Sequence, residues 1–164
     1  MENSNKTTNL NQTTLLKKAA KNVKTNQKIL DSIILIFEKM EKSELCQEAI
    51  DSVSEEIKIV EAYLNCTQIQ AILFSCIFGI QHRSGVSVNF EMISNHLGQS
   101  LLYVLKYMKD LNVLIKKDLL NQAEDENKIG SIYAVDKNVI NCIIEGVSLK
   151  NKNSDYDTLT VFFK

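Results

Sequence analysis

The residues of this 164-residue chain that could do chemistry are four cysteines and two histidines. Cys76 and His82 form the one Cys and His pair that is close in sequence, and no third group beside them would orient the imidazole. No two cysteines are two to four residues apart, which argues against a zinc knuckle and a redox pair. We therefore interpret the cysteines as small hydrophobic residues in a reducing compartment: Cys46, Cys66, Cys76 and Cys142.

Patterns for phosphate binding are also missing. The five glycines lie at positions 79, 85, 98, 130 and 146, and none belongs to a Walker or dinucleotide-binding pattern. His96 lies beside an expected turn, and we interpret it as a cap or a partly buried packing residue. The sequence predicts no catalytic residue, no cofactor and no metal site, and hence a chain that is not an enzyme.

Composition is that of a folded domain. The chain is 45% apolar with a net charge of -1, and at this length it can bury a sizeable core. Its most apolar segment, residues 29–37, is short and interrupted by polar side chains, so we expect neither a signal peptide nor a membrane span. A cytoplasmic protein is the expectation.

The N-terminal part is expected to be helical. Residues 1–11 are polar and predict a disordered tail, and residues 12–64 predict helices over about 12–23, 26–40 and from Ser43 onward. Residues 1–28 hold six lysines against one acid, whereas residues 29–66 hold nine acids against three lysines. This contrast predicts a helical hairpin with paired charges. The expected stripe of the second helix is Ile29, Ile33, Ile36, Phe37 and Met40, and that of the third is Leu45, Ala49, Val53, Ile57, Val60 and Leu64.

Residues 65–146 predict helix, short strand, helix, turn, helix and a two-stranded wing. Asn89 can cap a helix over residues 90–97, and Gly98 two residues before Ser100 allows a tight turn into the next helix. The predicted fold is mainly α, with an N-terminal helical hairpin and a winged helix-turn-helix that has a small two- to three-stranded sheet. The other expected elements are helix 67–80, strand 86–88, helix 101–117, strands 119–122 and 131–135, helix 136–145, and a linker or truncated segment over 147–164.

The helix over residues 101–117 is the expected binding element. The side chains expected to face the core are Leu101, Val104, Leu105, Met108, Leu111, Val113, Leu114 and Ile115. Asp110, together with Gln99 and Ser100 just before the helix, is expected to be exposed. The candidate partner-binding residues are Leu102, Tyr103, Lys106, Tyr107 and Lys109. The expected wing tip carries three acids and one base, Glu124, Asp125, Glu126 and Lys128, and acids at that position would repel DNA.

Three segments carry a family resemblance: residues 64–74, residues 86–88 and residues 105–111, followed by Tyr133-Ala134-Val135-Asp136. They resemble the N-terminal, winged-helix-like region that precedes the motor of some bacterial AAA-type ATPases, over about residues 45 to 146. The resemblance implies recognition of substrates, adaptors or sister subunits. The chain has no Walker motif, so no catalytic residue of that family has a matching position here.

Two functions remain open. The first is a non-catalytic interaction or regulatory domain of an AAA-type ATPase that binds a protein partner or sister subunits. The alternative is a winged-helix transcriptional regulator that binds DNA as a dimer, which the acidic wing disfavours. No membrane partner is expected, because the Lys-rich N-terminal segment lacks large apolar anchors.

Overall fold

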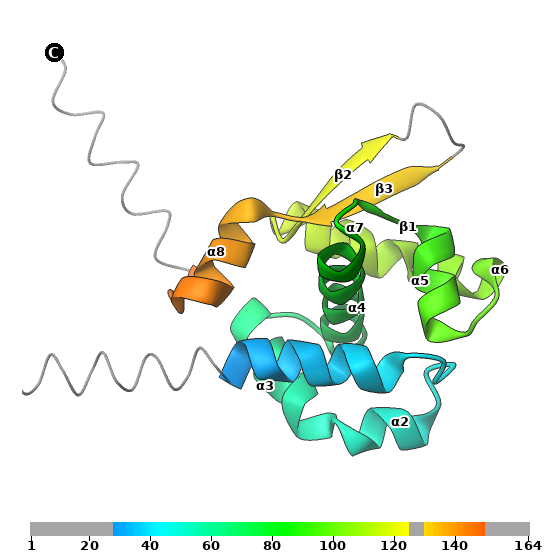
Figure 1. Cartoon of the computed structure of the whole chain (residues 1–164), viewed down its shortest axis with the longest axis horizontal. Coiled ribbons are helices and arrows are strands. Elements are labelled where there is room, and N and C mark those ends of the chain that lie inside the picture. The colour runs from blue at the N-terminus through cyan, green and yellow to red at the C-terminus, as the bar shows by residue number, and fades with distance from the viewer. Residues whose placement is uncertain (1–27, 125–129, 150–164) are drawn as a thin grey trace, which may run out of the picture.

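The computed structural model describes residues 28–124 and 130–149, which form a mainly helical unit with one small antiparallel sheet (Figure 1). Three expected parts of the chain lie outside the described residues: the tail over 1–11, the helix over 12–23 and residues 150–164 of the expected linker or truncated segment. The coarse fold class predicted from sequence is therefore confirmed for the part of the chain that is described.

The first described helix covers residues 28–40, and all five members of its expected apolar stripe are buried. The third helix was expected to start at Ser43, which is wrong. Lys42, Glu44 and Leu45 have positive φ angles of 54–55°, which no helix tolerates, and α2 (Gln47–Ser52) begins only after them. At Val53 the chain breaks again before α3 (Ser54–Leu64).

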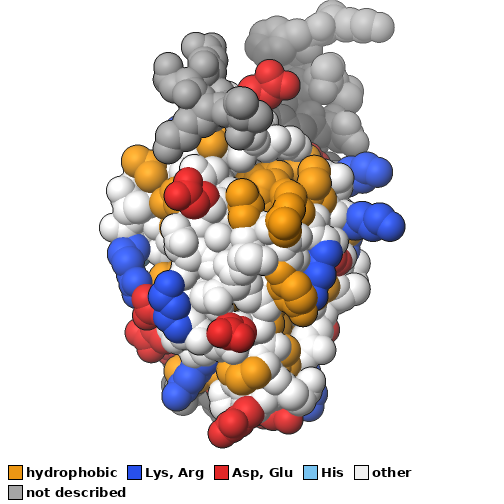
Figure 2. Space-filling model, turned by 90° about the vertical axis from the view of Figure 1, so that its right-hand side faces the viewer, with side chains coloured by type: hydrophobic (Ala, Val, Ile, Leu, Met, Phe, Trp, Pro, Cys, Tyr) orange, Lys and Arg blue, Asp and Glu red, His pale blue; other side chains and the backbone are white. Residues whose placement is uncertain are grey.

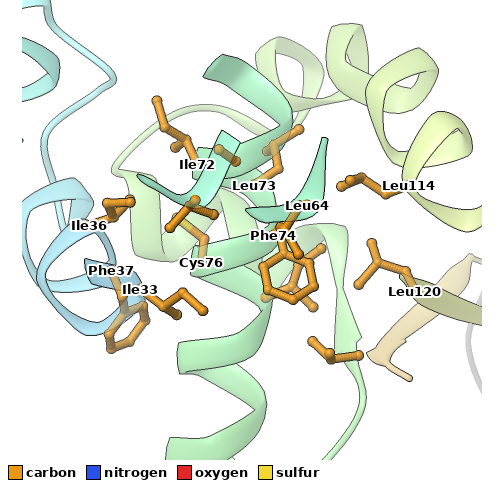
Figure 3. Packing of buried hydrophobic residues seen from close by; sticks show 14 of the residues in the cluster. Ile33, Ile36, Phe37, Leu64, Ile72, Leu73, Phe74, Cys76, Leu114 and Leu120 are labelled. Carbon is orange, nitrogen blue, oxygen red and sulfur yellow. The ribbon is translucent and has the colours of Figure 1, made fainter. Parts of the chain in front are cut away.

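Helix α4 (Gln68–Ser84) is the centre of the molecule (Figure 1). The side-chain oxygen of Gln70 accepts a hydrogen bond from the Thr67 amide, as in a capping box. Helix α4 is apolar on most of its circumference because elements pack on several sides of it. Figure 3 shows side chains of the 28–40 helix and of α7 and β2 converging on Ile72, Leu73, Phe74 and Cys76 of α4.

Helix α5 (Phe90–Leu97) and the start of the helix after it lie where the sequence signals predict, whereas the strand expected over residues 86–88 is found at residues 88–89. Strand β1 (Val88–Asn89) leads into α5, and the Asn89 side chain accepts from the Met92 amide at 2.9 Å. Gly98 has a φ of 74°, and Ser100 caps the next helix through the Tyr103 amide. A helix, a short turn and a second helix thus follow one another, which is the general helix-turn-helix arrangement.

The helix expected over residues 101–117 is not continuous. It consists of α6 (Leu101–Val104), a 3-10 turn η1 (Leu105–Tyr107) and α7 (Met108–Lys116). The buried residues of α6 and α7, Val104, Leu111 and Leu114, still lie at i, i+7 and i+10 on one face, but that face is narrow. The expectation that Leu101, Leu105 and Met108 face inward is therefore wrong, since all three are exposed.

The sheet has the strand order β1-β3-β2, with both neighbouring pairs antiparallel. Strands β2 (Leu120–Glu124) and β3 (Ser131–Val135) form a hairpin, and Tyr133 of β3 lies opposite Val88 and Gln122. Helix α8 (Lys137–Glu145) follows, with Asp136 as its N-cap and Gly146 as its C-cap.

One cluster of buried side chains runs from the 28–40 helix through α3 and α4 to α5, α7 and the sheet. It is continuous across residue 65, where the sequence predicts a boundary between units. No single helix within the described ranges is long and apolar enough to cross a membrane; the α3–α4 pair would qualify by length and composition, but it bends by 91°.

Candidate interaction surface

Five exposed apolar side chains gather on one short stretch of helix, and we call them the α6–α7 patch: Leu101, Leu102, Tyr103, Leu105 and Met108. Leu102 is 82% exposed, more than any other large hydrophobic residue in the described part of the chain. Only Val104, Leu111 and Leu114 of α6 and α7 are fully buried. The segment therefore packs against the core through one narrow stripe of side chains, and a wider apolar surface faces solvent.

The position of α6 explains this exposure. In Figure 1 it lies at the right-hand edge of the molecule, beyond α5, where no described element covers its outer side. Figure 2 views the molecule from that side and shows hydrophobic side chains grouped on it, with Lys or Arg side chains nearby. Single exposed apolar residues are ordinary on protein surfaces, whereas a contiguous group is typical of interaction sites.

Tyr103, Lys106 and Tyr107 form a small aromatic and cationic cluster beside the patch. The Lys106 ammonium lies 3.2 Å from the ring centroid of Tyr103 and 4.8 Å from that of Tyr107, and the two rings meet edge to face. Hydrogen bonding to Lys106 lowers the pKa of the Tyr103 phenol, and the same interaction raises the pKa of Lys106. Lys106 therefore stays charged at neutral pH.

Three polar residues that could have read DNA bases are occupied within the protein. Gln99 donates from its side-chain amide to the backbone oxygen of Glu44, and Ser100 caps α6. Asp110 accepts a hydrogen bond from the side-chain amide of Gln70, which is buried. Of the candidate residues, Leu102, Tyr103, Lys106 and Lys109 lie exposed together, while Tyr107 is half-buried.

His96 packs α5 against the 28–40 helix, in agreement with its interpretation as a packing residue. Its ring stacks on Phe37 at a centroid distance of 4.4 Å, and its Nε2–H donates to the Phe37 backbone oxygen. Burial lowers the pKa of His96, so the neutral imidazole is the stable form at neutral pH. The backbone oxygens of His96 and Leu97 accept from the amides of Lys42 and Glu44. The loop after the 28–40 helix therefore satisfies carbonyls at the end of α5 that a helix terminus would leave unpaired.

Sequence reasoning missed these long-range contacts because they join residues more than fifty positions apart. The predicted wing tip is only partly described. Glu124 ends β2 and is exposed, whereas Asp125, Glu126 and Lys128 lie outside the described residues. The expected repulsion of DNA by the wing therefore rests here on Glu124.

The residues considered for chemistry are not brought together. Cys76 is fully buried, which raises the pKa of its thiol to about 12, while His82 is exposed on the same helix. Cys142 is buried, Cys66 is half-buried with a pKa raised by burial to about 11, and Cys46 is exposed. Within residues 28–124 and 130–149, no group of three His, Cys, Asp or Glu side chains could hold a metal ion.

A hollow of about 260 Å³ lies beside His82, between α4 and α8. Its lining residue Gln81 is already engaged, because its side-chain oxygen accepts from the Val135 amide. Comparisons of the chain with protein-family models, with curated proteins and with solved structures each found no match.

Proposed function

We propose that this chain is a non-catalytic recognition domain that binds a protein partner through the α6–α7 patch. The observation that carries the proposal is the concentration of five exposed apolar side chains on α6, η1 and α7. Hydrophobic and aromatic side chains supply most of the binding energy at protein interfaces, and Tyr is enriched among the residues that contribute most. Tyr103 and Leu102 are the expected anchors.

The proposed fold behind this surface is a winged helix-turn-helix that serves protein contact. The element order from α4 to β3 supports it: helix, short strand, helix, turn, helix and a hairpin that pairs with the first strand. In this proposal α6 and α7 correspond to the recognition helix and β2 and β3 to the wing. The engaged side chains of Gln99 and Ser100 favour a protein partner over DNA.

The proposed setting is the N-terminal region of an AAA-type ATPase, where the partner is a substrate, an adaptor or a sister subunit. This setting is supported by the resemblance of residues 45 to 146 to the N-terminal regions of AAA-type ATPases. The genomic sequence that follows the codon for Lys164 tests this setting. A Walker motif there supports the ATPase setting, and a stop codon limits the proposal to a stand-alone interaction domain.

The recognition function is tested by affinity capture from native cell extract with three forms of the chain. They are the parent, the double variant Leu102→Glu with Tyr103→Ala, and the matched control Ile144→Glu, which changes an exposed apolar residue on α8. We expect the same protein to be retained by the parent and by the control but lost from the double variant. Equal retention by all three forms would contradict the proposal.

A second candidate is a transcriptional regulator that binds DNA as a dimer. Residues 98–117 favour it, since they hold four lysines against one acid, and that acid, Asp110, accepts a hydrogen bond from Gln70. Fluorescence anisotropy with mixed duplex DNA at low and at physiological salt tests it. Micromolar binding that weakens steeply with salt and is lost in Lys106→Glu with Lys109→Glu would establish this function over the first.

A further inference from the structure

The α6–α7 patch has the spacing of a helix-binding surface. Leu101, Leu105 and Met108 lie at positions i, i+4 and i+7, so their side chains form one row along the segment. A row of this kind is what an amphipathic helix presents when it packs against a second helix. All three side chains are exposed, and no described element of the chain covers them.

A second row beside it carries positive charge. Leu102, Lys106 and Lys109 have the same i, i+4 and i+7 spacing, displaced by one residue, and all three are exposed. Neither lysine is in a salt bridge with another described residue. A helix packed along the apolar row would thus have its flank next to two ammonium groups that no described carboxylate neutralises, as at the charged flanks of a coiled coil, although Lys106 also lies over the Tyr103 ring.

The acid nearest in sequence does not neutralise this flank. Asp110 is half-buried and accepts from the Gln70 side chain at 3.1 Å, which joins α7 to α4. Lys117, further along, donates to the backbone oxygen of Asn65. The α6–α7 segment therefore presents an apolar row beside a row that carries Lys106 and Lys109.

We propose that the α6–α7 patch binds an amphipathic helix of a partner protein whose apolar stripe is bordered by Asp or Glu. This rests on the proposed recognition function and names the chemistry of its partner. The charge border favours this occupant over a second copy of the chain, because a two-fold contact through the patch would bring Lys106 and Lys109 of both copies together. It is favoured over duplex DNA because apolar side chains, Leu102 above all, gain nothing from phosphate contacts.

The test uses two synthetic, fluorescein-labelled helical peptides with the full 164-residue chain. Both peptides carry Leu at i, i+3, i+4 and i+7 and a high Ala content; one has Glu and the other Lys at the flanking positions. Fluorescence anisotropy is measured at about 0.05 M and about 0.3 M salt, which change the screening length by about a factor of two. We expect the Glu peptide to bind, to weaken with salt, and to bind at least about tenfold more tightly than the Lys peptide.

Variants separate the apolar contacts of the α6–α7 patch from the contacts of its two lysines. Leu102→Ser should weaken binding of the Glu peptide by about tenfold or more, since Leu102 is 82% exposed in the free protein and would be buried by the peptide, and serine cannot supply that apolar burial. Lys106→Gln with Lys109→Gln should remove most of the preference for Glu over Lys flanks. Ile144→Ser, the matched control on α8, should leave binding unchanged. Far-UV circular dichroism of each variant should match the parent.

Three outcomes would overturn the acidic helix as the partner. Each can be told apart from a failure of the proposed recognition function. Equal affinity for both peptides, or binding of neither at about 1 mM, would remove the acidic helix as partner while extract capture could still succeed. A patch-dependent dimer in sedimentation equilibrium, abolished by Leu102→Ser, would assign the surface to a second copy. Tighter binding of duplex DNA than of the Glu peptide, with loss in the Lys106→Gln and Lys109→Gln variant, would assign it to nucleic acid.

Discussion

Gly79 lies in the interior of α4, where alanine would normally strengthen a helix, and we predict that alanine weakens this protein instead. A Cβ atom added at Gly79 would lie 2.3 Å from the Cγ and Cδ2 atoms of Phe37 and 2.7 Å from its Cδ1. The ring cannot move freely, because it stacks on His96 and has the Arg83 guanidinium 4.7 Å from its centroid. The 28–40 helix therefore rests on the backbone of α4 at this glycine.

Two terms of opposite sign decide the stability of Gly79→Ala. Replacing Gly by Ala within a helix contributes about 1 kcal/mol of stabilisation. Adding a methyl group to a filled core costs about 1–3 kcal/mol, and a contact at 2.3 Å, far below the roughly 3.5–4.0 Å optimum, belongs at the upper end. The expected net loss is about 2 kcal/mol, which for a chain of this length lowers Tm by roughly 4–8 °C.

Urea denaturation followed by circular dichroism measures this loss, with the m-value as a check that the transition remains two-state. Phe37→Leu provides the partner variant of a double-mutant cycle, because it removes the ring that alanine would strike. In that background Gly79→Ala should cost little or should stabilise, which gives a coupling energy of about 1–3 kcal/mol. If Gly79→Ala alone were as stable as the parent, the close approach of Phe37 to α4 would be refuted.

Three further predictions concern other parts of the fold. Asn89→Ala, which removes the side-chain cap of α5, should cost about 1 kcal/mol in urea denaturation, whereas Asn112→Ala on the exposed side of α7 should change stability by less than about 0.5 kcal/mol. Burial lowers the pKa of His96 in the folded state, so the unfolded chain binds the proton more readily and the free energy of unfolding should fall as the pH drops below about 6.5. His96→Gln should flatten this pH dependence, whereas His82→Gln, at the exposed histidine, should retain it. A fragment of residues 65–146 should give no cooperative thermal transition, since it lacks the helices that cover α4 and the loop amides that cap α5, and a sharp transition would instead support the predicted boundary at residue 65.

Local signals were sufficient to predict most helix ends. Asn89 and Ser100 accept hydrogen bonds from the first turns of their helices, and Gly98 adopts the left-handed conformation that a short turn requires. The β2–β3 hairpin was expected within two residues of its observed ends. These features depend on residues near one another in the sequence, which is why pattern alone predicts them.

The exposure of three members of the α6–α7 patch could not be predicted in the same way. An apolar residue at helical spacing is normally buried, and Leu101, Leu105 and Met108 fit that expectation in a continuous helix. No described neighbour covers the outer side of α6, so these three side chains stay in solvent. Of the five candidate partner-binding residues, four are exposed and Tyr107 is half-buried.

Loop 41–46 was missed for a different reason. Lys42, Glu44 and Leu45 hold left-handed backbone without glycine, so no sequence signal marks the turn. Its conformation is maintained by tertiary hydrogen bonds from the Lys42 and Glu44 amides to the end of α5. Contacts of this kind depend on the completed fold, and a single sequence does not report them.

The burial of α4 on most of its circumference has a consequence for how the molecule opens. Amides of a central helix can exchange with solvent deuterium only when the whole core separates, so the α4 amides should report the global free energy of unfolding. Helix α6 is one turn long, ends in a 3-10 turn and buries only Val104, so its amides should exchange through brief local opening. The surface offered to a partner would thus be the part of the fold that is first to loosen and that gains most order when it is bound.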